Sequence, residues 1–103
     1  MKIYIAGKIT GLQFSHVKVK FDHAERWLKT LHYNPVNPVN LFPDAKNVEW
    51  DQAMAVCLQV LKNCDAIYLL PDWSDSRGAR EEVKYALSLN MPIFNEHNII
   101  NHA

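Results

Sequence analysis

Short apolar runs alternate along the chain with segments of helical periodicity, and this alternation constrains the fold most strongly. Apolar runs bounded by turn residues predict strands at residues 3–6, 33–36, 66–70 and 91–94. Apolar residues recurring every three or four positions predict helices at residues 15–31, 50–64 and 79–90. Such strand–helix–strand units cross over right-handedly and form parallel sheets. We therefore expect an α/β fold, a small flavodoxin-like (Rossmann-like) three-layer sandwich whose mainly parallel sheet has roughly four to five strands.

The remaining segments are shorter or carry less pattern. Pro35 and Pro38 place the second strand near an edge, since proline cannot donate to a central ladder. Ser15 is a plausible N-cap for the first helix. Prolines and asparagines predict a loop at residues 38–47, whereas residues 95–103 carry no clear pattern. A chain of 103 residues has room for one hydrophobic core, so we expect one domain at residues 1–95 and a tail at 96–103.

Charge and cysteine usage exclude several classes of protein. Lysine plus arginine balance aspartate plus glutamate at eleven each, so we expect no nucleic-acid partner. The apolar runs are too short for a membrane span or signal segment, which predicts a cytoplasmic protein without membrane contact. Cys57 and Cys64 lie on one predicted helix with Cα atoms roughly 10 Å apart, too far for a disulfide. No metal-ligand spacing appears among the cysteines and histidines, and we expect neither a metal nor another cofactor.

Ligands of parallel α/β sheets bind at the carboxyl ends of the strands, which selects the loops at residues 7–11 and 71–78. The first loop runs from Gly7 to Gly11 and offers backbone amides, the Lys8 ammonium and the Thr10 hydroxyl. Glycines at this spacing also fit an ordinary strand-to-helix turn. The loop is therefore a candidate ligand-binding segment with a structural alternative.

The second loop contains Ser74, Asp75 and Ser76 before Gly78, and each of the three is a good helix N-cap. A free hydroxyl and exposed N–H groups at a helix start also bind phosphate, and glycine permits close approach of a ligand. Trp73 has two interpretations, stacking on a nucleobase or packing at the edge of the sheet. Capping and phosphate binding both remain open.

Glu82 stands out on the helix predicted at residues 79–90. The apolar stripe of that helix consists of Ala79, Val83, Ala86 and Leu87. Glu81 lies about 180° from the centre of this stripe, and Glu82 lies about 80° from it. The positive end of a helix favours an ionised carboxylate, the form that a nucleophile needs, although Glu82 there also suits a carboxylate that only complements the helix dipole.

Two segments, IYIAGKITG at residues 3–11 and CDAIYLLPDWSDSRGAREEVKYA at residues 64–86, resemble the nucleoside 2-deoxyribosyltransferase-like superfamily. The resemblance is closest to its short bacterial and phage branch of unknown function and runs over residues 2–94. In the superfamily a glycine precedes the catalytic glutamate by four residues, and an alanine follows four later. Gly78, Glu82 and Ala86 match this spacing, and Tyr4 matches a first-strand tyrosine near the sugar. The resemblance implies that Glu82 is the nucleophile.

Two positions depart from that pattern. The superfamily carries an aspartate eight residues before the aspartate that opens the strand, and Cys57 stands there. It carries another aspartate two residues before the motif glycine, where this chain has Ser76. Serine is similar to the branch that hydrolyses deoxynucleoside 5′-monophosphates, in which the hydroxyl helps to hold the phosphate. The first aspartate assists departure of the base, and Asp72 or Asp75 is a candidate replacement.

The resemblance implies retaining cleavage or transfer of the N-glycosidic bond of a nucleotide or nucleoside, with a covalent glycosyl intermediate on Glu82. The alternatives are a catalytically inactive nucleotide-binding module, or a structural protein in which Glu82 only caps a helix. The resemblance also implies a homodimer or larger homo-oligomer. The predicted catalytic residues are Glu82, Tyr4 and Asp75. The predicted substrate-binding residues are Gly7, Lys8, Thr10, Gly11, Trp73, Ser76 and Gly78.

Overall fold

The computed structural model describes residues 1–41 and 49–102. Its strands and helices are β1 Lys2–Ala6, α1 Phe14–Thr30, β2 Asn34–Val36, α2 Trp50–Lys62, β3 Ala66–Leu69, α3 Arg77–Ser88 and β4 Ile93–Asn95. Short 3₁₀ turns are η1 Pro38–Leu41, η3 Trp73–Asp75 and η4 Ile99–His102. Within the described residues, four strands pair in parallel in the order β2-β1-β3-β4. This arrangement confirms the predicted α/β class and the parallel sheet.

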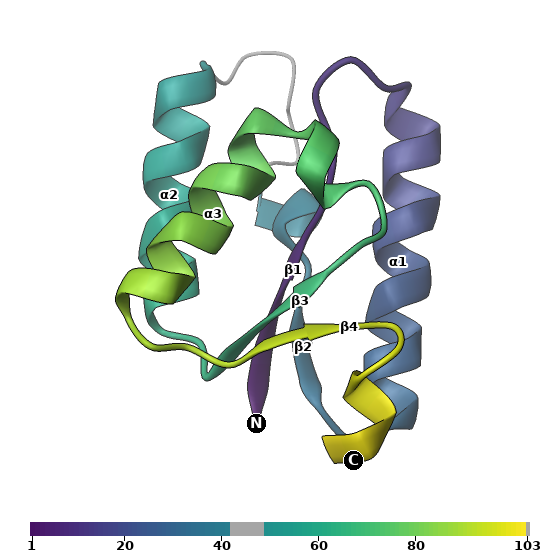
Figure 1. Cartoon of the computed structure of the whole chain (residues 1–103). Coiled ribbons are helices and arrows are strands. Elements are labelled where there is room, and N and C mark those ends of the chain that lie inside the picture. Colours follow the sequence, from purple (N-terminus) through teal and green to yellow (C-terminus); the bar gives the residue numbers. More distant parts are fainter. Residues whose placement is uncertain (42–48, 103) are drawn as a thin grey trace.

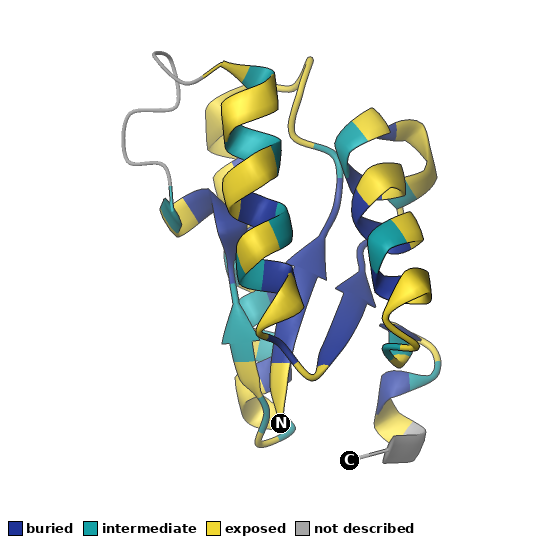
Figure 2. Cartoon of the chain, turned by 90° about the vertical axis from the view of Figure 1, so that its left-hand side faces the viewer, coloured by how far each residue is buried: buried dark blue, intermediate teal, exposed yellow. Residues whose placement is uncertain are grey.

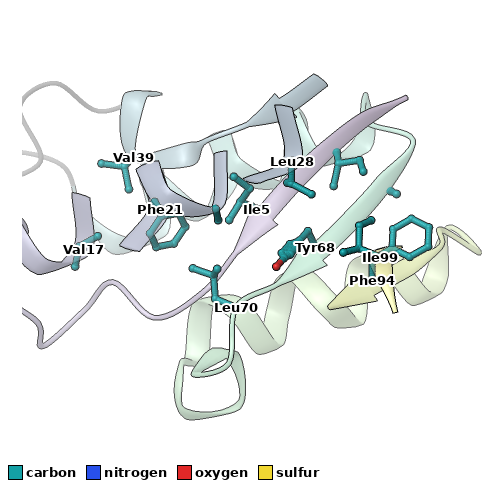
Figure 3. Packing of buried hydrophobic residues seen from close by; sticks show 12 residues of the cluster. Ile5, Val17, Phe21, Leu28, Val39, Tyr68, Leu70, Phe94 and Ile99 are labelled. Carbon is teal, nitrogen blue, oxygen red and sulfur yellow. The ribbon is translucent and has the colours of Figure 1, made fainter. Parts of the chain in front are cut away.

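The sheet is the middle layer, with α1 on one face and α2 and α3 on the other (Figure 1). Side chains alternate along the central strands, so Ile3 and Ile5 face α1 whereas Tyr4 and Ala6 face α2 and α3. Figure 3 shows side chains of the α1-side cluster, including Phe21 and Tyr68. Because β1 and β3 are covered on both faces, their sequences are apolar without interruption from Ile3 to Ala6 and from Ala66 to Leu69.

The helices bury one side and expose the other, as the exposed (yellow) and buried (dark blue) parts of α2 and α3 show in Figure 2. The predicted stripe of α1 is buried at Val17, Phe21, Ala24 and Leu28. The predicted cap Ser15 lies inside α1 instead, because Gln13 takes the N-cap position with an extended backbone and its carbonyl accepts from the amides of His16 and Val17. None of the described helices combines the length and apolar character that crossing a membrane requires.

The stripe predicted for α3 is wrong at one position. Leu87 is 59% exposed, whereas Glu82 is only 6% exposed. The buried side of α3 consists of Ala79, Glu82, Val83 and Ala86. These positions follow the i, i+3, i+4, i+7 pattern of a single helix face. Glu82 therefore belongs to the buried side of α3 and lies at one edge of it, about 50° from its centre.

Two segments between and after the regular elements also differ from the prediction. Pro38–Leu41 forms a 3₁₀ turn, and the rest of the loop predicted at residues 38–47 lies outside the described residues. Ile99, in the segment without a clear sequence pattern, is fully buried in the α1-side cluster. The segment after β4 therefore contributes to the core.

The segments that follow β1 and β3 run close together where the two strands end. The Leu70 amide donates to the Ala6 carbonyl at 2.8 Å, and the next residue after Ala6 is Gly7. A Cβ atom at Gly7 would lie 2.5 Å from Leu70 Cδ1 and 3.0 Å from Leu70 Cβ. Only glycine allows this approach, which brings the loops after β1 and β3 together.

Candidate functional site

A pocket of about 620 Å³ opens at the carboxyl ends of β1 and β3. Its walls come from three parts of the chain: β1 with the loop after it, the inner side of α2, and the segment from η3 into α3. These parts lie at the same end of the sheet in Figure 1. The position agrees with the rule that parallel sheets bind ligands beyond the carboxyl ends of their strands.

Glu82 lies in this pocket beside Tyr4. Tyr4 is fully buried on the central strand β1, and its hydroxyl donates a hydrogen bond to Glu82 Oε2. Cys57 of α2 also lines the pocket and is buried. Three elements distant in sequence thus bring a carboxyl, a phenol and a thiol together. Glu81, the adjacent residue, is exposed.

Burial sets the charges of these three groups. It raises the pKa of Glu82 to about 7, although the hydrogen bond from Tyr4 acts in the opposite direction. It raises the pKa of Cys57 to about 11, with a smaller lowering by the Tyr4 hydroxyl and a raising by the nearby Glu82 charge. The pKa of Tyr4 is also raised, first by burial and then by Glu82. Near neutral pH, Glu82 is therefore the member of this trio that changes charge.

The start of α3 forms the wall next to Glu82. Ser76 is the N-cap of α3, and its Oγ accepts a hydrogen bond from the Ala79 amide at 3.1 Å. One of the three predicted capping residues thus has that role, and Ser76 also lines the pocket. A Cβ atom at Gly78 would lie 3.3 Å from Met54 Sδ. Glycine here lets the first turn of α3 pack closely against α2.

The structure brings some of the predicted site residues together and separates others. Besides Glu82 and Tyr4, the pocket is lined by the predicted residues Gly7, Thr10, Asp75, Ser76 and Gly78. Lys8, Gly11 and Trp73 lie outside the pocket that the described residues form. Trp73 packs against the hydrophobic cluster under α2 and α3, which is the edge-packing alternative. Gly11 is exposed and has φ +85°, a conformation that suits a turn.

Lys8 belongs to a polar clamp between the two site loops. Asp72 Oδ1 accepts the Lys8 amide at 3.0 Å, and Asp72 Oδ2 accepts from Lys20 Nζ. The same ammonium donates to the Lys8 carbonyl at 2.7 Å. Both Asp72 oxygens are therefore used in holding the loops, and Asp72 lies outside the pocket lining. Asp75 is the carboxylate that remains as a candidate to assist departure of a base.

Sequence reasoning missed most of the α2 wall and one cation. Trp50, Ala53 and Met54 line the pocket, as does Arg77. The Arg77 guanidinium lies 4.2 Å from the centroid of the Trp50 ring. Trp50 belongs to the apolar pattern that predicted the helix at residues 50–64, and such a pattern does not distinguish an apolar residue under a sheet from one beside a cavity. The position of Arg77 between the predicted site residues Ser76 and Gly78 was the sequence feature that pointed to its place in the pocket.

The side chains able to ligate a metal are dispersed over the described part of the chain. There, no group of three or more His, Cys, Asp or Glu residues is placed to hold a metal ion. The described cysteines Cys57 and Cys64 are both free thiols. The chemistry available to the pocket is therefore argued from Glu82 and its neighbours.

Comparison with known proteins gives a family and a fold. The model of the family described as a domain of unknown function, DUF4406, matches residues 1–95. Among solved structures, a 2-desoxiribosyltransferase from Leishmania mexicana is similar, with a TM-score of 0.67 and 18% sequence identity. The match covers 91% of this chain and 62% of that one, so this chain spans less than two thirds of its length. No curated protein matches the sequence.

Proposed function

This chain belongs to the DUF4406 family, and we propose that it breaks the N-glycosidic bond of a deoxynucleoside 5′-monophosphate through Glu82. The observation that carries this proposal is the buried carboxyl of Glu82 in the pocket, bonded to the Tyr4 hydroxyl. The fold similarity to a 2-desoxiribosyltransferase supports a nucleoside-like substrate. A pocket of about 620 Å³ also lies in the range of small-molecule sites.

The reaction follows the retaining pattern. The bond from Tyr4 holds Glu82 Oε2, so Oε1 is the oxygen that attacks the anomeric carbon. The carbon–nitrogen bond breaks, and its electron pair leaves with the base, which takes up a proton. Water then adds to the glycosyl ester and restores the carboxylate. The net products are the free base and the sugar 5-phosphate.

The site lacks an efficient general acid to protonate the departing base. The Cys57 thiol, with a pKa raised to about 11, holds its proton too tightly to act as an efficient acid near pH 7. Asp75 lines the pocket but is exposed. We therefore propose slow turnover, with water rather than a second base as the acceptor.

Chromatography of free base after incubation with a panel of nucleoside monophosphates tests the proposal. Glu82→Gln keeps the shape of the side chain and its hydrogen bond from Tyr4 but removes the nucleophile, so base release should fall by at least roughly 10³-fold. Glu81→Gln is the matched control, because it neutralises the adjacent exposed residue and should leave the rate unchanged. Equal rates for Glu82→Gln and the wild type would reject Glu82 as the nucleophile.

Cys57→Asp tests the missing acid in the same assay. A carboxyl group beside Glu82 shares its proton with that residue, since two carboxylates so close do not both ionise, and it can deliver this proton to the departing base. We expect base release to rise by up to about 10²-fold. No gain would show that protonation of the base does not limit the rate.

The second candidate is a nucleotide-binding module without catalysis. The neutral Cys57 thiol and the raised pKa of Glu82 favour it, because both reduce the supply of acid and nucleophile near pH 7. In that case neither the wild type nor Cys57→Asp releases base, while calorimetry still detects nucleotide binding.

A further inference from the structure

Two residues at the starts of different helices form one wall of the pocket. Trp50 is the first residue of α2, and Arg77 is the first residue of α3. The guanidinium of Arg77 stacks over the Trp50 ring at 4.2 Å, and both residues line the pocket. Stacking on an aromatic face orients a guanidinium while leaving its N–H groups free for in-plane hydrogen bonds. The pair therefore presents the guanidinium N–H donors of Arg77 to the pocket in a fixed orientation.

The charges around the pocket make this cation distinctive. Among the described residues that line it, Glu82 and Asp75 are carboxylic acids and Arg77 carries the positive charge. Salt bridges within residues 1–41 and 49–100 involve other cations, namely Lys18, Lys20 and His97. Lys8, the cation expected from the sequence, lies outside the pocket. Without Arg77, an anionic ligand would meet only like charge.

Arg80 shows the contrast one turn further along α3. Its Nη1 donates to the Ser74 carbonyl at 2.8 Å, so this guanidinium is used to hold the η3 turn. Arg80 is exposed and lies outside the pocket lining. The two arginines share a helix and a charge but differ in access to the pocket, which makes Arg80 a matched control for Arg77.

We propose that Arg77, braced by Trp50, recognises the phosphate of the substrate and makes the pocket select nucleoside monophosphates over free nucleosides. Arginine suits this role because its fork binds two oxygens of a phosphate at once. Ser76, which is buried beside Arg77 in the same wall, offers its hydroxyl to the same group. The inference rests on the proposed function for the identity of the ligand, but it concerns binding rather than bond cleavage.

Calorimetric titration with a nucleoside and with its 5′-monophosphate tests the inference. Glu82→Gln serves as the background, so that neither ligand is consumed during the titration. The measured quantity is the ratio of the two affinities. In this background we expect the monophosphate to bind about 10- to 100-fold more tightly than the nucleoside.

Adding Arg77→Gln should bring the ratio close to one and leave the nucleoside affinity within about threefold. Adding Arg80→Gln should leave the ratio unchanged. Trp50→Leu should lower the ratio by a smaller factor, because the guanidinium keeps its charge but loses its support. Arg77→Lys should also give an intermediate ratio, since an ammonium lacks the planar fork. Thermal melting of each variant checks that it is folded.

An unchanged ratio in Arg77→Gln, or an equal fall in Arg80→Gln, would overturn the inference. Absence of binding by both ligands in the Glu82→Gln background would overturn it as well. The outcome is separate from that of the proposed function. A wild type that releases no base still has a measurable affinity ratio, and a wild type that releases base can have a ratio independent of Arg77.

Discussion

At the residue scale, the arrangement around Glu82 is a carboxyl removed from water and given a neutral hydrogen-bond donor. Such a group is stabilised less as an anion than an exposed carboxylate is, and its pKa rises to about 7. Its ionised fraction therefore increases between pH 6 and pH 8. If Glu82 acts as nucleophile, base release should increase over the same interval, because the attacking form is the carboxylate.

The same shift predicts a pH dependence of stability. The pKa of Glu82 is about 7 in the folded protein and near its ordinary value of 4.5 in the unfolded chain. Between these values the folded state binds more protons, so the free energy of unfolding decreases as pH rises. Glu82→Gln does not titrate, and its advantage over the wild type should grow by about 2 to 3 kcal/mol between pH 5 and pH 8.

Urea unfolding of both proteins at the two pH values measures this difference. Glu81→Gln is the control, because Glu81 is exposed and its neutralisation should give a nearly constant difference. A Glu82→Gln curve that runs parallel to the wild type would mean that Glu82 titrates normally in the folded protein.

Single residues were predictable from the sequence where periodicity applied. The helical wheel placed Glu81 in solvent and Glu82 near the buried side, and the structure has them so. The loops have no repeating apolar pattern, so the positions of their side chains could not be predicted in this way. Lys8 and Trp73 were grouped with the site because they follow the right strands. In the structure Trp73 packs under α2 and α3, and Lys8, whose backbone amide binds Asp72, lies outside the pocket lining.

At the scale of elements, strands and helices followed from apolar spacing, whereas the side that each helix buries did not follow fully. Leu87 is more hydrophobic than Glu82, yet Leu87 faces solvent and Glu82 faces the sheet. The orientation of α3 depends on its contacts with α2 and with the sheet, which are contacts between elements. A pattern within one helix contains no information about them.

The close approach at Gly7 gives a prediction at this scale. Gly7→Ala places a Cβ against Cβ, Cγ and Cδ1 of Leu70, which cannot all turn away by rotation of the side chain. We expect the free energy of unfolding to fall by about 1 to 3 kcal/mol. The midpoint of urea unfolding measures the change.

Gly78→Ala is the matched control for Gly7→Ala. Its nearest obstacle, at 3.3 Å, is Met54 Sδ in a flexible side chain, and alanine favours the helix. Its free energy of unfolding should therefore stay within about 1 kcal/mol of the wild type. Equal losses in both variants would show that Leu70 is not the constraint at Gly7.

At the scale of the whole molecule, the strand order places the pocket. The chain moves from β1 to β2 on one side and returns to β3 on the other, so β1 and β3 flank the point where the order reverses. Parallel α/β sheets bind their ligands at this point. The two loops selected from the sequence follow β1 and β3, which is why both contribute residues to the pocket.

The surface near the pocket predicts self-association. Ile9, Leu12 and Phe14 are 41%, 40% and 53% exposed in the segment after β1, and Ile9 also lines the pocket. We propose that a second copy covers this apolar segment, in accord with the homo-oligomer that the sequence resemblance implies. Light scattering at micromolar concentration should give at least twice the 11.9 kDa of one chain.

Phe14→Ser should shift the protein toward the mass of one chain, because it removes apolar area from the proposed contact. Val19→Ser is the control, since Val19 is also apolar and is 66% exposed, but it lies further along α1, beyond residues 9–14. A wild type with the mass of one chain, or equal shifts in both variants, would contradict the proposal.

The alternation of β1 has a consequence for how this site can change over generations. Tyr4 faces Glu82 because its two neighbours, Ile3 and Ile5, face α1. Inserting or deleting one residue between Tyr4 and Gly7 would turn Tyr4 toward α1 and bring another side chain beside the carboxyl. Side chains of β1 would then face the wrong one of the two hydrophobic clusters. The partner of Glu82 can therefore be altered by substitution at position 4 but not by sliding the strand, so the spacing between Tyr4 and Gly7 is fixed together with the fold.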